Sequence, residues 1–211
     1  MGTIDPKSLE YFQEGHAKMG KGNYKGAIDS FNKAINTSSN FWEAYLNRGI
    51  CKRNLKNNQG GTIDLNTSLS IKTTWNAYYN LSLIKIDLAD YKSALYYCDK
   101  GLQVNNEISY LYRNRGQIKS ITKDNTGAIG DLTKAIKYTK LDGEYAYLYY
   151  YRGELKYLSG DNQGALHDLN KAIKYEPKNI KFYNKRAYYL SESGHQEESL
   201  EDYNKAIEID P

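Results

Sequence analysis

The chain has 211 residues, of which 40% are hydrophobic and 26% are charged, and its formal net charge is +4. This balance is typical of a folded domain and excludes a disordered chain. The 29 basic and 25 acidic residues are intermixed, without the basic blocks of a nucleic-acid-binding arm, and no apolar run reaches the roughly 20 residues of a membrane helix. We therefore expect no nucleic-acid partner and no membrane span.

Residues 1–7 lack the basic and apolar regions of a signal peptide and read as a leader left by expression. We expect a cytoplasmic protein, unless a natural targeting segment is missing from this sequence. Cys51 and Cys98 are too few for a disulfide framework and form no CxxC or Cys/His cluster. Both are expected to be small buried hydrophobes, and neither a metal nor a cofactor is predicted.

Three near-copies of one segment follow the leader, and they begin at Asn47, Asn114 and Tyr151. They read NRGICKRNLKNNQGGTIDL, NRGQIKSITKDNTGAIGDL and YRGELKYLSGDNQGALHDL. Because self-similarity at a fixed period marks a repeat architecture, we number each unit so that the glycine of RG, or the residue in its place, is position 8. The chain then divides into six units, residues 8–41, 42–74, 75–108, 109–145, 146–179 and 180–211.

Every unit has the pattern of a helical hairpin. Position 4 is tyrosine in all six units, and positions 8, 20 and 27 are always small. Apolar residues recur with helical spacing in the second half of the unit, as at Ala128, Ile129, Leu132, Ala135 and Ile136. Gly, Asn and Asp residues form turns between the halves. Small residues let two helices approach closely, and one hairpin cannot bury its apolar stripe alone. The pattern therefore predicts six stacked hairpins.

The pattern resembles the tetratricopeptide repeat, which has a large aromatic residue at position 4, Leu-Gly at 7 and 8, Ala at 20 and 27, and Pro at 32. The resemblance covers residues 8–211, but position 7 is leucine only at Leu81 and position 32 is proline only at Pro177 and Pro211. It implies an all-α fold, an α-solenoid whose hairpins form a right-handed superhelix as a single domain. It also implies a protein-protein interaction scaffold without catalysis.

Position 7 is arginine in four units, and position 23 of the same four units is aspartate. The pairs are Arg48 and Asp64, Arg115 and Asp131, Arg152 and Asp168, and Arg186 and Asp202. The two units without the arginine also lack the aspartate. We predict that each pair joins the two helices of its hairpin by a charge-assisted hydrogen bond. Capture of an acidic ligand by these arginines is disfavoured, because an arginine matched to an aspartate is not free.

In the family, positions 2, 5, 6, 9 and 12 of each first helix line a concave groove, and the resemblance places the ligand there. Position 6 is asparagine in three successive units, at Asn47, Asn80 and Asn114. This row resembles the asparagine ladder of another member of the class, because amides can bond the backbone of an extended peptide; the alternative is a solvated surface. Beside the row, apolar side chains either form ligand pockets or pack between hairpins: Phe12, Leu46, Ile50, Tyr79 and Leu83.

The C-terminal half of the expected groove is basic and aromatic. Four residues fall at positions of the carboxylate clamp of chaperone-binding members, namely Arg113, Gln117, Lys181 and Lys185. Tyr151 replaces the central asparagine of that clamp, which disfavours a chaperone-type clamp but leaves affinity for an acidic segment open. Tyrosine offers large contact area at low entropic cost, although a chain with 22 tyrosines has them on many surfaces. The tyrosines of the expected groove are Tyr147, Tyr150, Tyr151, Tyr157 and Tyr188.

The hairpin pattern brings none of the three histidines, His16, His167 and His195, near a cysteine or serine as a nucleophile and base. No GxxxxGK[ST], GxGxxG or HExxH motif is present. We therefore predict a scaffold, not an enzyme, that holds a protein or peptide partner. The alternative is a structural scaffold that self-assembles into a homo-oligomer through the solenoid ends or the groove. RNA binding is disfavoured by the intermixed acidic residues.

Overall fold

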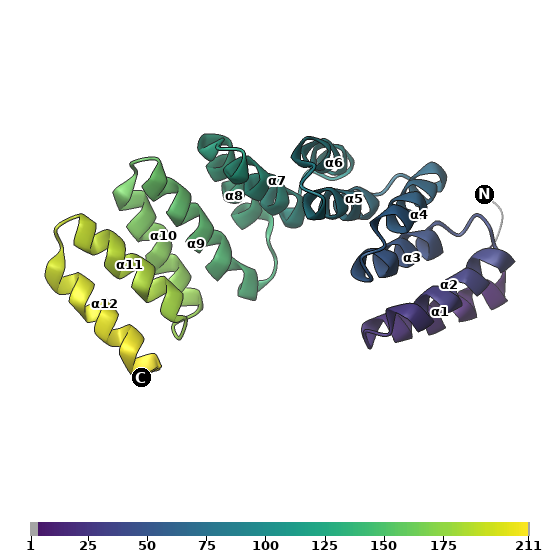
Figure 1. Cartoon of the computed structure of the whole chain (residues 1–211), viewed down its shortest axis with the longest axis horizontal. Helices are drawn as coiled ribbons and strands as arrows, with labels where there is room; N and C mark the ends of the chain where they lie inside the picture. Colours follow the sequence, from purple (N-terminus) through teal and green to yellow (C-terminus); the bar gives the residue numbers. More distant parts are fainter. Residues whose placement is uncertain (1–3, 211) are drawn as a thin grey trace. The chain divides into compact units, whose positions relative to one another are not determined.

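The computed structural model describes residues 4–210, and over that range the chain is all-α. This part of the chain contains twelve helices that follow one another as six hairpins, as Figure 1 shows. The bounds are α1 Pro6–Gly20, α2 Tyr24–Thr37, α3 Trp42–Asn54, α4 Asn58–Ile71, α5 Trp75–Asp87, α6 Tyr91–Val104, α7 Ser109–Ile121, α8 Asn125–Tyr138, α9 Asp142–Leu158, α10 Asn162–Tyr175, α11 Ile180–Glu192 and α12 Gln196–Ile209. The prediction of six helical hairpins is confirmed.

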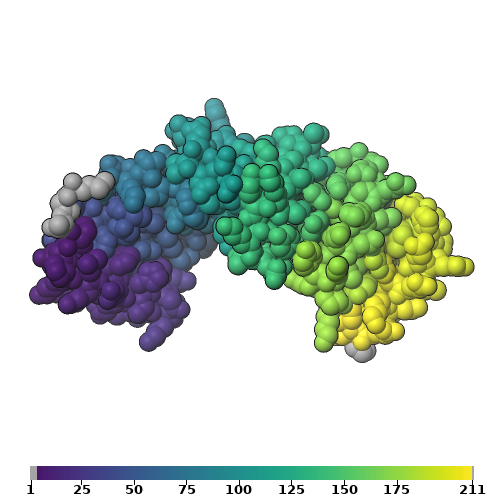
Figure 2. All heavy atoms as spheres, turned by 180° about the vertical axis from the view of Figure 1, so that it is seen from behind, coloured from purple at the N-terminus to yellow at the C-terminus, as the bar shows by residue number. Residues whose placement is uncertain are grey.

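The chain is divided into two compact units, Met1–Asn106 with α1 to α6 and Glu107–Pro211 with α7 to α12. Each unit holds three hairpins. In the second unit the hairpins lie side by side in chain order, from teal through green to yellow in Figure 2. The expected position-32 proline at Pro211 lies outside the described residues.

The first helix begins earlier than the predicted start of the first unit at Ser8. Pro6 is the first residue of α1, and the side chain of Asp5 caps the helix by accepting a hydrogen bond from the backbone N–H of Lys7 at 2.8 Å. The backbone N–H of Asp5 also donates to Ser38 Oγ at 3.1 Å. Residues 5–7, which we assigned to a leader, therefore form the cap and first turn of the helix. Proline suits this place because its missing N–H is not needed there.

A tight turn joins the two helices of every hairpin. Position 15 has a left-handed backbone in all six turns, with φ of 75° at Gly22, 62° at Lys56, 55° at Ala89, 68° at Lys123, 86° at Gly160 and 83° at Gly194. The next residue is Asn or Asp in five hairpins, and its side chain accepts a hydrogen bond from a backbone N–H in the first turn of the second helix. Turn and cap together set where each second helix begins.

The predicted close approach of the two helices is confirmed at the glycines of position 8. A Cβ atom on Gly153 would lie 3.2 Å from the carbonyl oxygen of Ala165, and one on Gly49 would lie 3.2 Å from that of Gly61. Only a residue without a bulky side chain leaves room for the backbone of the facing helix. The small residues at positions 8 and 20 therefore set the spacing within a hairpin.

Neighbouring hairpins of one unit share their buried side chains. Leu46 and Leu65 of the second hairpin pack with Leu81 and Ile84 of the third. In the second unit, Leu169 of the fifth hairpin packs with Tyr189 of the sixth. Stacking thus buries the apolar stripe that a single hairpin leaves open.

The predicted Arg–Asp pairs are present in all four hairpins, and each pair is bidentate. Asp168 accepts from Arg152 Nε at 2.8 Å and from Arg152 Nη2 at 2.7 Å. Asp64 accepts in the same way from Arg48 at 2.8 and 2.7 Å. The other two pairs repeat the geometry: Arg115 with Asp131 and Arg186 with Asp202. All four aspartate side chains are at most 7% exposed.

Sequence reasoning missed two further partners of this network. A lysine at position 11 reaches the same aspartate in three hairpins, at 2.8 Å for Lys52, 2.9 Å for Lys119 and 3.0 Å for Lys156. Arginine Nη1 atoms donate to position 25 of the preceding hairpin, as from Arg48 to Asn32 Oδ1 at 2.7 Å and from Arg152 to Thr133 Oγ1 at 3.0 Å. The arginine therefore joins its own hairpin and links it to the one before.

Candidate functional site

The face of each first helix that was expected to line a groove lies opposite the ion pairs. Successive residues of an α-helix turn by about 100°, so positions 2 and 9 point away from positions 7 and 11, and position 12 lies on the same flank as position 5. Positions 5 and 6 lie on the two flanks of that face, turned toward the following and the preceding hairpin. Side chains on the flanks are therefore expected to be more buried than those at the centre.

In the first unit, the flanking side chains contribute to the core. Leu46 at position 5 is 6% exposed and packs against Leu81 and Ile84 of the following hairpin. Phe12, also at position 5, packs with its ring centroid 4.9 Å from that of Phe41. Ile50 lies partly buried against the Leu46 cluster. For these residues the structure favours packing between hairpins over pockets for a ligand.

Tyr79 and Leu83, the other two apolar residues expected in the groove of this unit, are half-buried on α5. They retain some surface that a ligand can contact. The apolar part of the first-unit face is accordingly small.

The asparagines at position 6 are less available than a ladder requires. Asn80 is 6% exposed, and its Oδ1 accepts from Arg53 Nη1 at 3.0 Å while its Nδ2 donates to the carbonyl oxygen of Asn76 at 2.8 Å. Asn114 is 2% exposed, and Asn47 is half-buried. The amide of Asn80 is thus engaged within its own unit, and a ligand would have to displace these bonds to use it.

The five tyrosines of the C-terminal half lie on α9 and α11, and we call them the tyrosine surface: Tyr147, Tyr150, Tyr151, Tyr157 and Tyr188. Tyr147, Tyr151 and Tyr188 are 43%, 40% and 47% exposed. The ring centroids of Tyr147 and Tyr151 are 6.5 Å apart, and those of Tyr157 and Tyr188 are 6.2 Å apart.

Two buried rings that sequence reasoning missed support the tyrosine surface from below. Phe182 lies 5.6 Å from Tyr147 and 5.2 Å from Tyr150, measured between ring centroids. Tyr189 stacks on Tyr157 at 3.7 Å. They occupy positions 3 and 10, which face the preceding hairpin, so the only sequence signal was that these positions are apolar in the neighbouring units. Of the exposed rings, Tyr147 is held by Phe182, and Tyr188 by Tyr189 with centroids 5.7 Å apart.

Glu154 lies within the tyrosine surface and is paired on two sides. Tyr150 donates its hydroxyl hydrogen to Glu154 Oε1 at 3.1 Å, and Lys185 Nζ lies 2.9 Å from the same oxygen. Burial, together with the negative charge of Glu154, raises the pKa of Tyr150, so its hydroxyl stays protonated and remains a donor. The charge of Lys185, which lies at a clamp position, is therefore balanced inside the protein.

A second cation at a clamp position is also paired. Arg113 Nη1 lies 3.0 Å from Glu144 Oε1. Glu144 belongs to an additional first turn of α9, which results from the three extra residues of the fourth unit. Gln117 and Lys181 are exposed. Of the three cations among these four side chains, Lys181 is the one that has no acidic partner among residues 4–210.

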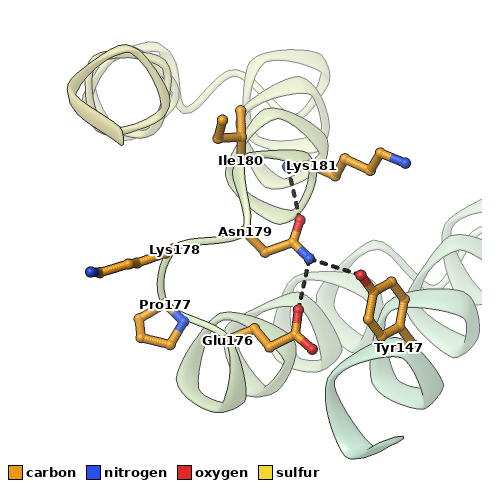
Figure 3. A pocket seen from close by; sticks show the side chains of 7 residues that line it. All are labelled: Tyr147, Glu176, Pro177, Lys178, Asn179, Ile180 and Lys181. Atoms are coloured by element: carbon orange, nitrogen blue, oxygen red, sulfur yellow. Dashed lines mark hydrogen bonds between the residues drawn. The ribbon is translucent and has the colours of Figure 1, made fainter. Parts of the chain in front are cut away.

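Lys181 borders a shallow pocket of about 630 Å³ at the start of α11. Figure 3 shows that Asn179 holds the pocket together: its Nδ2 donates to Glu176 Oε2 at 2.8 Å and lies 3.4 Å from the hydroxyl oxygen of Tyr147. The backbone N–H of Lys181 donates to Asn179 Oδ1 at 3.2 Å. The pocket thus extends the tyrosine surface at the Tyr147 end.

Among residues 4–210, no group of three or more His, Cys, Asp and Glu side chains is arranged to hold a metal ion. His195 Nδ1 lies 3.3 Å from Glu198 Oε1 at the start of α12. His16 and His167 are exposed on separate hairpins. In the same range, no helix is long and apolar enough to cross a membrane.

Comparison with known proteins identifies the repeat. Two segments match models of the tetratricopeptide repeat, residues 11–41 and residues 169–201. No curated protein matches the sequence. The likeness to solved structures, by contrast, extends over nearly the whole chain.

Three of these structures illustrate the likeness. PilF of Pseudomonas aeruginosa has a TM-score of 0.83 at 13% identity, covering 99% of this chain and 94% of that one. YrrB, described as a tetratricopeptide-repeat protein with an unusual peptide-binding site, has a TM-score of 0.73 at 19% identity, covering 87% and 94%. A chain of the Cut9–Hcn1 heterotetramer of the APC/C has a TM-score of 0.74 at 14% identity. The match covers 97% of the present chain but only 40% of the chain in that structure.

The fold and the repeated register define an α-solenoid of helical hairpins. Within that class, residues 11–41 and 169–201 match the tetratricopeptide repeat, and the helical hairpins between them repeat the same register. Such repeats typically serve as scaffolds for protein-protein interaction and generally carry no catalytic residues.

Proposed function

We propose that the chain binds a segment of a protein partner and that the tyrosine surface on α9 and α11 makes the main contact. One observation carries this proposal: Tyr147, Tyr151 and Tyr188 expose 40% or more of their area although each packs against another ring. Tyr147 contacts the buried Phe182, Tyr188 contacts the buried Tyr189, and Tyr151 contacts the half-buried Tyr150. Rigid, exposed tyrosines lose little conformational entropy on binding and are enriched among the residues that dominate interface energies.

The charges around the tyrosine surface indicate what kind of segment it takes. Lys185 and Arg113 are neutralised by Glu154 and Glu144, so the surface lacks the cluster of unpaired cations that a strongly acidic peptide requires. Apolar and aromatic side chains of a partner would pack against the rings, and Lys181 would meet an acidic group at one edge. We therefore propose a largely uncharged partner segment with an acidic residue at one end.

The peptide-binding site of YrrB supports a binding role only by analogy, because 19% identity shows a shared fold. The asparagine row contributes less to the proposal, since Asn80 is already bonded within its unit.

A peptide library selected against the whole chain tests the proposal. The selected peptides are titrated by fluorescence anisotropy against wild type, a Tyr151→Ala/Tyr188→Ala variant and a Tyr96→Ala/Tyr175→Ala control. The control removes tyrosines of similar exposure, 55% and 43%, from second helices. We expect the first variant to bind about 30-fold more weakly, which corresponds to about 2 kcal/mol, and the control to bind like wild type. Equal loss in both variants, or no loss in the first, would refute a site on the tyrosine surface.

A further inference from the structure

The last helix, α12, exposes an apolar stripe that has no counterpart elsewhere in the second unit. Leu200 and Ile207 are each 62% exposed, and Tyr203 is 38% exposed. These residues occupy positions 21, 24 and 28 of the sixth hairpin and lie along one face of the helix. Figure 1 shows α12 beside α11 at the end of its unit.

The same positions are partly or fully buried wherever another hairpin of the unit follows. Position 24 is Phe31, Leu65, Leu132 or Leu169 in such hairpins, and each is at most 1% exposed. The covering element is the next first helix, which packs its own positions 3 and 10 there, for example Ala77 and Ile84 of α5 against Leu65. The α12 stripe therefore has the composition of a surface that receives a helix.

A polar feature of the covered surfaces is also present on α12. Asn32, Thr133 and Asn170 at position 25 each accept a hydrogen bond from the arginine of the following first helix. Position 25 of the sixth hairpin is Asn204, which is exposed. An arginine that a docked helix carries in the place of position 7 could donate a hydrogen bond to the Asn204 side chain in the same way.

The charge of α12 sets it apart from the other second helices. It carries five acidic residues and one lysine, whereas each of the other second helices has at most one more charge of one sign than of the other. Asp202 forms an ion pair with Arg186, and the exposed Glu208 forms one with Lys205. By helical spacing, Glu197, Glu201 and Glu208 lie in a row beside the apolar stripe. A helix seated on the stripe would meet this acidic row with its own flank.

We propose that this α12 surface, made of Leu200, Tyr203, Asn204 and Ile207 with the acidic row beside it, docks a basic amphipathic helix of a partner protein. Apolar residues seven positions apart would cover the stripe, an arginine midway between them would donate to Asn204 Oδ1, and basic residues on one flank would face the acidic row. This site is separate from the tyrosine surface.

A second copy of the chain fits the α12 surface poorly. Head-to-tail stacking would use α1, whose positions 3, 7 and 10 are Glu10, Glu14 and Ala17, all exposed. Two glutamates would then face the acidic row. Tail-to-tail pairing of two α12 helices would bring two acidic rows together. Like charges at such contacts are destabilising, so the charge pattern favours a basic partner over self-assembly through this end.

A stapled peptide with the sequence of α7, Ser109–Ile121, is a suitable probe. It has the chemistry of a first helix, with Leu111 and Ile118 at positions 3 and 10 and Arg115 at position 7, and it contains three basic residues and no acidic one. A staple between residues 110 and 114 would keep it helical, because an isolated helix of this length is marginal in water. Its affinity for the whole chain is measured by fluorescence anisotropy at low and physiological salt.

Binding of this peptide should weaken at least tenfold in a Leu200→Asn/Ile207→Asn variant. A matched Leu158→Asn/Ile63→Asn control, which changes side chains that are 69% and 59% exposed elsewhere, should bind within twofold of wild type. Asn204→Ala in the protein and Arg115→Gln in the peptide should each weaken binding, and the two losses should not add. Circular dichroism checks that each variant is folded.

Three results would overturn the proposal. The first is equal affinity of the peptide for wild type and the Leu200→Asn/Ile207→Asn variant. The second is unchanged affinity in a Glu197→Gln/Glu201→Gln/Glu208→Gln variant at low salt. The third is a dimer of the wild type in light scattering that this apolar-to-asparagine variant converts to a monomer, because a second copy would then cover the stripe. The Tyr151→Ala/Tyr188→Ala variant should bind the α7 peptide normally, so the two proposals fail independently.

Discussion

Replacement of Asp168 by alanine should destabilise the chain strongly through the network in the fifth hairpin. The Asp168 side chain is fully buried and accepts from Arg152 Nε at 2.8 Å, Arg152 Nη2 at 2.7 Å and Lys156 Nζ at 3.0 Å. Without the carboxylate, two cations remain that are 13% and 19% exposed. Loss of one partner of a buried ion pair costs about 3–5 kcal/mol, and because both cations retain contact with water we expect about 3 kcal/mol.

The prediction is checked by thermal and urea unfolding followed by circular dichroism. For a chain of this size, 1 kcal/mol shifts the melting temperature by about 2–4 °C, so a fall of about 6–12 °C is expected. Glu14→Ala is the matched control, because Glu14 and Lys18 also form an ion pair but are 46% and 35% exposed. Its melting temperature should stay within about 2 °C of wild type. A similarly small shift for Asp168→Ala would refute the reasoning, since the site would then be hydrated.

The third hairpin supplies a rescue for this experiment. It has Leu81 at position 7 and Tyr97 at position 23, and its Lys85 lies 3.2 Å from Asp90. An Arg152→Leu/Asp168→Tyr variant reproduces that arrangement. Asp161 occupies the same repeat position as Asp90, so its carboxylate can form an ion pair with Lys156. The double variant should recover part of the stability that Asp168→Ala loses. A double variant less stable than Asp168→Ala would show that the apolar solution does not transfer between hairpins.

Three further changes have expected outcomes that unfolding experiments can check. Ala89→Gly should stabilise by about 0.5–1 kcal/mol in urea unfolding, because a left-handed backbone is strained for alanine, and no gain would contradict this. Gly15→Ala should cost about 1–3 kcal/mol, because its Cβ would lie 2.6 Å from a buried phenylalanine ring, whereas Gly130→Ala, with open space around it, should gain about 0.5–1 kcal/mol in the same assay. Burial raises the pKa of the Cys51 thiol from 9.0 to about 11, so above pH 9 the folded state binds more protons than the unfolded state. The free energy of unfolding should therefore fall between pH 9 and 11 by up to about 1.4 kcal/mol per pH unit. Cys51→Ala should make this pH dependence weaker.

The repeat made most of the fold predictable. Six tyrosines at one position and small residues at three others placed the starts of α3, α5, α7 and α11 at Trp42, Trp75, Ser109 and Ile180. The Arg–Asp pairs were predictable because both positions change together among the six units. These features depend on contacts within one hairpin, where the sequence separation of the two partners is fixed.

The candidate site was harder to predict because the burial and the ion pairing of its residues depend on neighbouring hairpins. The sequence placed Leu46 and Asn80 at groove positions, but positions 5 and 6 lie on the flanks of the groove face and become buried when hairpins stack. Arg113 was placed at a clamp position, and it is paired because three extra residues add a turn to α9 that carries Glu144. Such pairings join residues about thirty positions apart, and a periodic pattern does not encode them.

The geometry of the first helix explains how stability and recognition can vary separately in this chain. Arginine at position 7 and lysine at position 11 hold the hairpin on one side of the helix, and Tyr147, Tyr151 and Tyr188 lie on the other side. A substitution at the centre of the groove face therefore leaves the ion pairs and the facing glycine intact. Tyr151→Ala and Tyr188→Ala should alter partner binding with little change in the melting temperature, whereas Asp168→Ala should do the reverse as long as the protein is folded. A variant of the tyrosine surface that lowered stability as much as Asp168→Ala would show that its rings serve mainly to pack the fifth hairpin against the sixth.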